Sequence, residues 1–515
     1  MHVTSRVAAA AAVGGLGLAL AFPPWSVPWL APVALAVFFV AVGSCRVRGG
    51  AVLGFVFGLA FFGPTLWWLG QSIAPAAWAA LVTVQAGWLA LVGAGSTLVR
   101  RLPGWPVWTA ALWTSVEGVR SSVPWGGLPW GRLGSTAVDT PWAGALALVG
   151  VAGTGTAVAL SGAVIAFVVE RARLRGPALA PAATALVACS IGGVLLLAIG
   201  VWSPSSAGAN DPTPAGQTAT VGIVQASVPG DGTDVATYHR EVTRTLLGET
   251  RNLREASTTA EPIMDLVVWP ENATAVDPAT DATARAALLS AVQVSGAPVL
   301  AGSVVDGPSS ATALNRGIVW TGTGPQGHYT KQHLVPFGEY VPLRPLAELI
   351  STRVSNIERD MLPGPSPSPL DLGGLLVANA LCFDVAYDDV LREQVGRGAG
   401  LVIVQTSNAM FLGTAQQEQQ WMVTRARAVE LGRSVIVSSM NGISGAIAPD
   451  GTVITRLQAA QAGSTVVSVD VRTATTPAVR LGSWPARSAY IASILAIVAA
   501  ASRKRACNQV EGINR

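Results

Sequence analysis

The sequence predicts a membrane domain of about eight transmembrane helices joined to one extramembrane α/β domain. Half of the 515 residues are hydrophobic and only 12% are charged, which is about half the charged fraction of a typical soluble protein. The apolar excess fills residues 7–201 and 486–501, whereas the rest of the chain has an ordinary globular composition. We therefore expect a membrane domain at 1–203, a linker at 204–217, an extramembrane domain at 218–480, and a last helix with its tail at 481–515.

The apolar regions divide into segments of roughly the length needed to cross about 30 Å of hydrocarbon. The first segment could be mistaken for a signal peptide, but it lacks a small-residue cleavage site and further apolar segments follow it. The predicted spans are 7–22, 30–42, 51–69, 77–98, 107–119, 143–169, 179–201 and 486–501.

Positive charges predict the orientation of these spans. Lys and Arg gather at every second connection, while the intervening turns at 23–29 and 70–75 carry none. The positive-inside rule assigns the basic connections to the cytoplasm, which places both termini inside and residues 204–480 outside. The basic clusters are Arg6, Arg46 with Arg48, Arg100 with Arg101, Arg171 with Arg173 and Arg175, and Arg503 with Lys504 and Arg505.

The connection after the fifth span departs from this pattern. Glu117 and Arg120 precede a stretch of aromatic residues and glycines that ends at Arg132. This connection is either a re-entrant or substrate-contacting loop, or an interfacial aromatic belt beside a Glu117–Arg120 pair one helical turn apart.

Composition also narrows the classes of partner and cofactor. The net charge is +4 and the globular region has no basic patch, so we expect no nucleic-acid partner. The four histidines lack ligand spacing, and we expect no metal and no other cofactor. The four cysteines show neither a CxxC pair nor disulfide spacing, which predicts that Cys382, alone in the globular region, is a free thiol.

The extramembrane region alternates strands with helices, a pattern typical of a mixed-sheet α/β domain. A hairpin is expected at 322–327, and a helix is expected to start at 385–389. The predicted strands are 219–225, 265–269, 298–302, 317–320, 375–381, 400–405, 434–438, 445–448 and 465–471, and the predicted helices are 238–256, 280–294 and 413–431.

Cys382 ends an apolar strand at a bend toward the expected helix. This arrangement would place the sulfur at the mouth of a sheet, where backbone N–H groups and a helix N-terminus favour a nucleophilic thiolate. The alternative is an inert cysteine packed as a small apolar residue.

Two further strand ends carry groups suited to assist a thiol. Glu271 follows the strand 265–269 and is a candidate general base, or else an ordinary loop carboxylate. Lys331 precedes a Pro-bounded turn and could lower the pKa of the thiol and stabilise an oxyanion, or else be a solvated hairpin lysine. Glu339, at the tip of that turn, is a candidate second acid.

Glu271, Lys331 and Cys382, in this chain order, resemble the Glu-Lys-Cys arrangement of the nitrilase superfamily. The stretch Lys331-Gln-His-Leu-Val-Pro-Phe-Gly-Glu-Tyr-Val-Pro342, between seven spans and an eighth, resembles the apolipoprotein N-acyltransferase family. The similarity extends to Asn315 and to residues 425–433 and 441–444. The chain departs from the family at Phe383, Asp384, Met410 and Gln420, where Tyr, Glu, Trp and His are usual.

The resemblance implies a nitrilase-like α-β-β-α sandwich outside the plasma (inner) membrane of a bacterium. It implies that Glu271 takes the proton of Cys382 and that the thiolate attacks a phospholipid ester. Lys331 and the N–H of Phe383 would hold the oxyanion, and the α-amine of a diacylglyceryl-cysteine on an apolipoprotein would receive the acyl chain. The residues expected to support the site are Asn315, Glu339, Phe383, Asp384 and Tyr387. The bilayer is a further expected partner, and we expect a monomer.

Two other functions are compatible with parts of the sequence. A membrane-tethered amidase or nitrilase-type hydrolase would use the same three residues with water as acceptor, although seven spans exceed what an anchor requires. A transporter or sensor with an inactive enzyme-like domain is the second alternative, but intramembrane charges are sparse and the three residues are intact.

Overall fold

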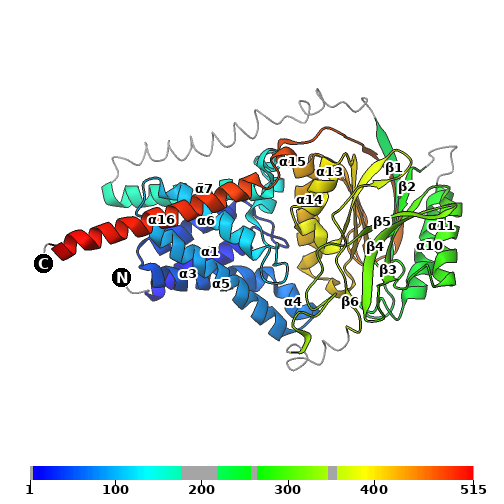
Figure 1. Cartoon of the computed structure of the whole chain (residues 1–515), viewed down its shortest axis with the longest axis horizontal. Coiled ribbons are helices and arrows are strands. Elements are labelled where there is room, and N and C mark those ends of the chain that lie inside the picture. The colour runs from blue at the N-terminus through cyan, green and yellow to red at the C-terminus, as the bar shows by residue number, and fades with distance from the viewer. Residues whose placement is uncertain (1–3, 176–216, 257–263, 346–356, 514–515) are drawn as a thin grey trace. The chain divides into compact units, whose positions relative to one another are not determined.

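The computed structural model describes residues 4–175, 217–256, 264–345 and 357–513 (Figure 1). These residues belong to two compact units, one formed by 1–203 with 481–515 and the other by 204–480. The predicted span at 179–201 and the linker up to residue 216 lie outside the described residues.

The first unit is helical, and its longest helices are apolar. Four segments are long and apolar enough to cross a membrane, namely α3, α5, residues 143–173 of α7 and residues 484–503 of α16, while α1 and α2 are shorter apolar helices. The described elements are α1 (Ser5–Ala19), α2 (Leu30–Gly43), α3 (Val47–Thr65), α4 (Trp67–Ser72), α5 (Pro75–Val99), α6 (Trp105–Arg120), η1 (Leu133–Asp139), α7 (Ala143–Arg175) and α16 (Trp484–Ile513).

Glycines allow two of these helices to pack with their backbones in contact. A Cβ on Gly54 of α3 would lie 2.2 Å from the carbonyl oxygen of Leu89 in α5. A Cβ on Gly93 of α5 would lie 2.0 Å from the carbonyl oxygen of Gly50. Small residues at helix interfaces are typical of membrane proteins, where association depends on close packing.

The connection after α6 is folded back by buried charges. The Arg120 guanidinium donates hydrogen bonds to the carbonyls of Leu128 and Trp130 at 2.9 Å, and Glu117 accepts the N–H of Leu133 at 3.0 Å. Glu117 lies 3.8 Å from both Arg120 and Arg132. The expected Glu117–Arg120 pair is present, but both residues are buried and organise the loop, in which Trp130 is also buried.

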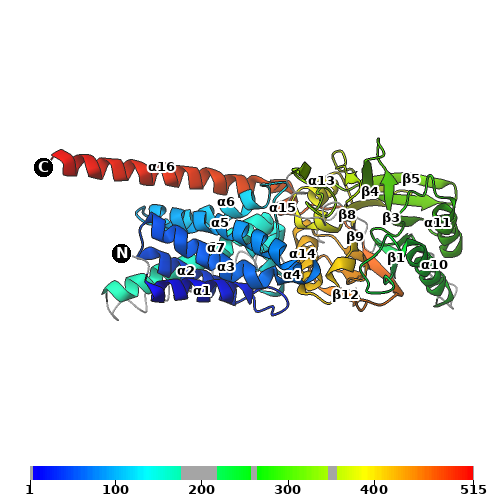
Figure 2. The same ribbon diagram turned by 90° about the horizontal axis from the view of Figure 1, so that it is seen from below.

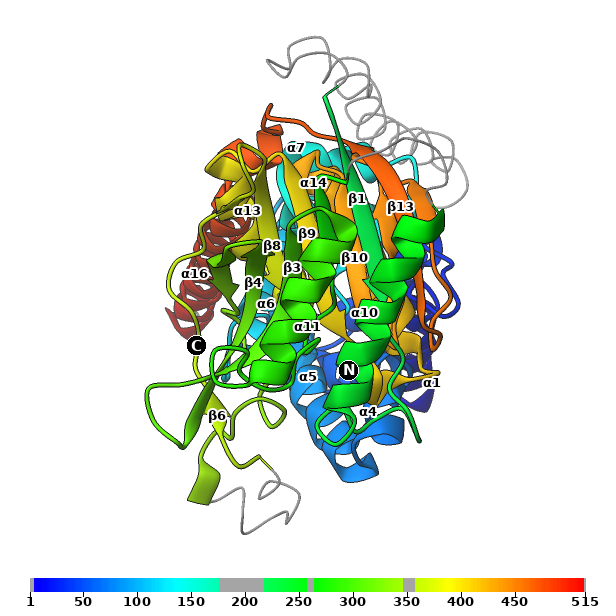
Figure 3. The same cartoon turned by 90° about the vertical axis from the view of Figure 1, so that its right-hand side faces the viewer.

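The second unit is a sandwich of two mixed sheets covered by helices on both outer faces. One sheet has the order β13-β1-β2-β3-β4-β5, with β6 beside β4, and the other has the order β12-β11-β10-β9-β8-β7. Strands β1, β2 and β3 are parallel to one another, as are β8, β9 and β10. Helices α10 and α11 cover the first sheet, and α13 and α14 cover the second (Figures 2 and 3).

The bounds of these elements follow most of the predicted ranges. They are β1 (Thr218–Gln225), α10 (His239–Ala256), β2 (Leu266–Val268), α11 (Ala282–Ser295), β3 (Val299–Asp306), β4 (Thr312–Thr321), β5 (Gly324–Thr330), β6 (Asp360–Met361), β7 (Leu370–Asp371), β8 (Leu376–Leu381), η4 (Cys382–Ala386), α13 (Val390–Gly396), β9 (Leu401–Ser407), η5 (Ala409–Phe411), α14 (Ala415–Leu431), β10 (Val435–Met440), β11 (Gly445–Ile447), β12 (Val453–Arg456), β13 (Gly463–Asp470) and α15 (Pro477–Leu481).

The side chains of β2 point alternately into two different cores, which explains why its sequence is continuously apolar. Leu266 and Val268 belong to the core between the two sheets, whereas Val267 and Trp269 pack in the core beneath α10 and α11. Because side chains alternate across a strand, a strand covered on both faces needs apolar residues at every position. This covered strand leads directly to Glu271.

The prediction that a helix starts at 385–389 is wrong. The chain instead forms the short 3₁₀ helix η4 from Cys382, Tyr387 is extended, and α13 begins at Val390. The Asp389 carboxylate accepts the Val390 N–H, so this acidic residue precedes the helix as a cap rather than lying within its first turn.

Candidate active site

The structure brings Glu271, Lys331 and Cys382 together from both sheets. Glu271 follows β2, Lys331 directly follows β5, and Cys382 directly follows β8. The thiol experiences the charges of both Glu271 and Lys331. The predicted strand ends therefore converge on one site within the second unit.

Glu271 is buried and accepts hydrogen bonds at both carboxylate oxygens. Oε1 accepts from Asn315 Nδ2 at 2.7 Å and from Lys331 Nζ at 3.1 Å. Oε2 accepts the backbone N–H of Ser407 at 2.8 Å. Since Asn315 belongs to the first sheet and Ser407 to the second, the carboxylate is held between the two sheets in one orientation.

Lys331 is fully enclosed and paired with two carboxylates. Its Nζ lies 3.1 Å from Glu271 and 2.8 Å from Glu339. Burial lowers the pKa of Lys331, but Glu271 and Glu339 outweigh this effect and hold that pKa well above its usual value. The lysine is therefore a fixed ammonium group, not the solvated hairpin lysine considered from sequence.

Cys382 occupies a sharp elbow at the end of β8. Its φ is 48°, in the left-handed region that non-glycine residues rarely adopt. Such backbone strain is concentrated at functional sites, where the surrounding structure maintains it. The residue as a whole is partly accessible.

A raised pKa keeps the Cys382 thiol neutral. Burial, together with the charge of Glu271, raises the pKa of Cys382 to about 12, although Lys331 and a hydrogen bond from Thr406 act in the opposite direction. Lys331 thus lowers the pKa as expected, but its effect is outweighed because the neighbouring carboxylate disfavours a second negative charge. Attack by this sulfur requires a base, and Glu271 is the adjacent candidate.

Asn315 and Glu339 connect the base to the ammonium group. Asn315 Nδ2 also lies 3.2 Å from Glu339 Oε1, and Glu339 Oε2 accepts the Val335 N–H at 2.8 Å. Glu339 is therefore part of the charged cluster and fixes the turn that follows Lys331.

Asp384 links the elbow to the segment that carries Lys331. This fully buried carboxylate accepts hydrogen bonds from the Tyr329 hydroxyl at 2.7 Å, the His333 N–H at 2.8 Å and the Leu381 N–H at 3.2 Å. Burial raises the pKa of Asp384, and Lys331 opposes this change. The arrangement fixes the position of Cys382 relative to Lys331.

Phe383 and Tyr387 contribute aromatic packing beside the elbow. Tyr387 stacks on His333, with ring centroids 3.6 Å apart, and Phe383 meets Tyr387 edge-on at 5.2 Å. His333 Nε2 lies 2.9 Å from Asp389. Two of the predicted supporting residues thus pack against one edge of the site.

Sequence reasoning did not assign a role to the polar groups on the α14 side of Cys382. Thr406 and Ser407 end β9, and Gln420 comes from α14 with Nε2 3.9 Å from the Cys382 sulfur. The sequence feature that could have identified Thr406 is its position at the polar end of an apolar strand. Within the described ranges, no group of three or more His, Cys, Asp or Glu side chains could hold a metal ion.

Comparison with known proteins relates both units to one family. Residues 14–164 match the apolipoprotein N-acyltransferase N-terminal domain, and residues 220–481 match the carbon-nitrogen hydrolase family. An apolipoprotein N-acyltransferase of Mycolicibacterium smegmatis is 32% identical over 491 residues, which cover 92% of this chain and 81% of that protein. Another from Photobacterium profundum is 28% identical over 494 residues, which cover 90% and 89%.

Solved structures similar to the chain include an amidase from Nesterenkonia sp. AN1 with a covalent adduct at its active-site cysteine. It has a TM-score of 0.38 and 18% sequence identity, and the alignment covers 52% of this chain and 94% of the amidase. A carbon-nitrogen hydrolase from Helicobacter pylori has a TM-score of 0.37 and 15% identity, covering 53% and 92%.

The electrostatics of the site predict opposite effects of Glu271→Gln on two reactions of Cys382. Removing the carboxylate charge lowers the thiol pKa, because Glu271 raises it in the parent protein. Alkylation by iodoacetamide at neutral pH should become faster, by about 10-fold for each pKa unit, while any reaction that uses Glu271 as base should slow. Peptide mass spectrometry of Cys382 over time measures the alkylation rate.

Glu255→Gln is the matched control, since Glu255 is exposed on α10 at the outer face of the first sheet. It should alkylate like the parent protein. Slower alkylation in Glu271→Gln would show that the carboxylate promotes thiolate formation at rest, contrary to the charge arrangement described above.

Proposed function

The chain belongs to the apolipoprotein N-acyltransferase family, and from that premise we propose that it acylates apolipoproteins through a thioester on Cys382. The protein is an N-acyltransferase of lipoprotein biosynthesis in the bacterial cell membrane, with lipid and apolipoprotein as partners. The observation that carries the proposed route is the convergence of a carboxylate, an ammonium group and a neutral thiol in one buried site.

In the first half-reaction, Glu271 accepts the Cys382 proton as the sulfur attacks the ester carbonyl of a phospholipid. Lys331 stabilises the oxyanion: two of its three N–H groups donate to carboxylates within the described residues, and the third is the proposed oxyanion donor, together with the Phe383 N–H. The C–O bond breaks, Glu271 returns the proton to the departing lysophospholipid, and a thioester remains.

In the second half-reaction, the α-amine of a diacylglyceryl-cysteine attacks the thioester carbonyl. Glu271 takes the amine proton, the C–S bond breaks, and the proton returns to the sulfur of Cys382. The acyl chain leaves as an amide and the resting thiol is restored. A thioester suits this transfer because an amine attacks it more readily than water does.

Family membership favours this route over the two other functions compatible with the sequence. An amidase-type hydrolase would account for residues 220–481 but not for the family match at 14–164. A transporter or sensor would not account for a buried base oriented by three donors.

Intact-mass analysis after mixing the purified protein with phospholipid tests the proposal. We expect one acyl mass on Cys382 in the parent protein, loss of the adduct in Cys382→Ser, and a decrease of at least about 100-fold in adduct formation in Glu271→Ala, since general-base catalysis contributes 10²–10⁴-fold. Cys45→Ser is the matched control, because Cys45 is a free cysteine of the other unit, and it should retain the adduct.

Adding a diacylated peptide then separates transfer from hydrolysis. The proposal predicts N-acyl peptide with consumption of the thioester. Release of free fatty acid without N-acyl peptide would support a hydrolase, and a parent protein without any adduct would exclude the thioester route.

The proposed topology places both termini in the cytoplasm and the second unit outside. It rests on the basic clusters at alternate connections and on the chemistry, since diacylglyceryl-cysteine and phospholipid are both available to an enzyme at the outer leaflet.

Cysteine labelling in cells tests this topology. In a cysteine-free background, Asp231→Cys and Arg48→Cys each introduce an exposed thiol. A membrane-impermeant maleimide should label Asp231→Cys in intact spheroplasts and Arg48→Cys only after lysis. The reverse pattern would contradict the orientation.

A further inference from the structure

A side-chain amide from α14 lies close to Cys382 and has no role assigned above. Gln420 is 5% exposed, and its Nε2 lies 3.9 Å from Cys382 Sγ, 3.4 Å from the Cys382 carbonyl oxygen and 3.1 Å from Thr406 Oγ1. One N–H of Gln420 can therefore donate to Thr406 while the other donates to Cys382.

The orientation of this amide is supported by its contact with the Cys382 carbonyl and by the hydrogen bonds around Asn408. Gly442 N–H donates to Ser439 Oγ at 3.1 Å, and the Ser439 hydroxyl donates to Asn408 Oδ1 at 3.0 Å. Asn408 Nδ2 in turn donates to Gln420 Oε1 at 2.7 Å. A carbonyl oxygen can only accept, so the contact with the Cys382 carbonyl favours the orientation in which Gln420 presents its NH₂ group to Cys382.

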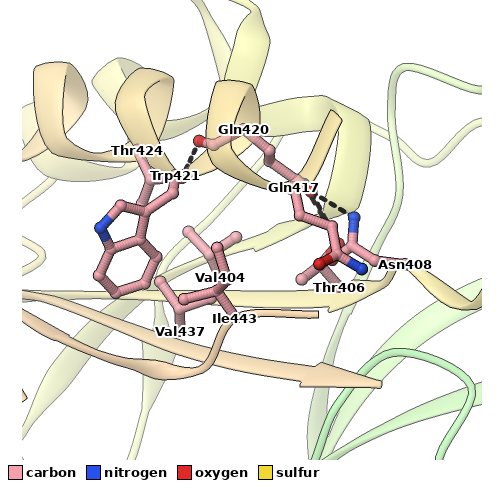
Figure 4. A pocket seen from close by; sticks show the side chains of 9 residues that line it. All are labelled: Val404, Thr406, Asn408, Gln417, Gln420, Trp421, Thr424, Val437 and Ile443. Atoms are coloured by element: carbon pink, nitrogen blue, oxygen red, sulfur yellow. Dashed lines mark hydrogen bonds between the residues drawn. The ribbon is translucent and has the colours of Figure 1, made fainter. Parts of the chain in front are cut away.

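The space beside Gln420 is too small for an acyl chain. The cavity between α14 and the strands has a volume of about 10 Å³, which is room for about one water molecule. Figure 4 shows Gln420 at the top of this cavity, the Trp421 ring at the left, and Val404, Thr406 and Val437 lower in the view. Gln420 lines this small cavity, and its amide reaches the elbow of Cys382.

We propose that Gln420 is a positioning residue that orients the Cys382 sulfur and donates a hydrogen bond to it as the thiolate forms. The inference rests on the proposed thioester route. A sulfur that is neutral at rest gains its charge only during attack, when a preorganised donor is most effective. An amide suits this role because it does not titrate, so it cannot compete with Glu271 for the thiol proton.

Thr406 completes the arrangement. Its Oγ1 accepts from Gln420 Nε2 at 3.1 Å. The same hydroxyl lies 3.4 Å from Gln420 Oε1 and 3.5 Å from Asn408 Oδ1, and its hydrogen bond to the thiol lowers the pKa of Cys382. The sulfur thus has two neutral donors on the α14 side and the charged pair Glu271–Lys331 elsewhere around it. The neutral donors would therefore stabilise the thiolate, while Glu271 accepts its proton.

Gln420→Met tests the proposal, because methionine keeps the volume and removes both donors. Hydrogen bonds to charged groups contribute about 1.5–3 kcal/mol, so we expect the rate of thioester formation to fall about 10- to 100-fold with the KM for phospholipid unchanged. The pH at which iodoacetamide alkylates Cys382 half-maximally should also rise. Gln420→Glu, which replaces the donor by a carboxylate, should lose at least as much activity.

Gln417→Met is the matched control. Gln417 comes from the same helix, lines the same cavity and is buried, but its Nε2 donates to the Asn441 carbonyl. Thermal unfolding of each variant in detergent verifies folding. We expect Gln417→Met to form the thioester at the parent rate.

The outcomes separate this inference from the proposed function. Absence of the thioester in the parent protein would overturn the thioester route itself. A normal thioester in the parent with an equal rate in Gln420→Met, or an unchanged alkylation profile in that variant, would overturn the role of Gln420 alone. Equal loss in Gln417→Met and Gln420→Met would show that packing of α14, rather than the donor, is responsible.

Discussion

The buried carboxylate of Glu271 is the constraint on which the site depends. Its two oxygens are held by Lys331, by Asn315 from the first sheet and by the backbone of Ser407 from the second. A buried charge is tolerated only when it is paired and hydrogen-bonded. The same contacts that satisfy this charge therefore join the two sheets and hold the carboxylate near Cys382, whose thiol experiences its charge.

This constraint explains how a neutral thiol can be a useful nucleophile. Burial and the adjacent charge of Glu271 keep the proton on the sulfur at rest, since two neighbouring negative charges are disfavoured. In the proposed mechanism, the proton moves to Glu271 during attack while Lys331 stabilises the charge on the former carbonyl oxygen. An enzyme that keeps its sulfur protonated between turnovers also limits oxidation, because the thiolate is the reactive form. This protection would be relevant to a free cysteine in a domain that the proposed topology places outside the cytoplasm.

The sequence was informative where apolar strands end in polar residues. Continuous apolar runs predicted β2 and β8, and Glu271 and Cys382 follow the ends of these strands. The hydrogen bond from Gln420 could not be predicted, since it joins residues 38 positions apart and depends on the side-chain orientation of Asn408. The helix expected at 385–389 was displaced because the elbow at Cys382 first forms a 3₁₀ turn, which is fixed by contacts of Asp384 with a distant segment.

The pH dependence of thioester formation tests the role of Glu271 most directly. Single-turnover rates with phospholipid should be nearly constant from about pH 7 to about pH 9 in the parent protein, because an internal base removes the proton. In Glu271→Gln, only the preformed thiolate reacts, so a slower rate should rise about 10-fold for each pH unit until the thiol is ionised. Parallel profiles in the two proteins, both rising with pH, would contradict the account.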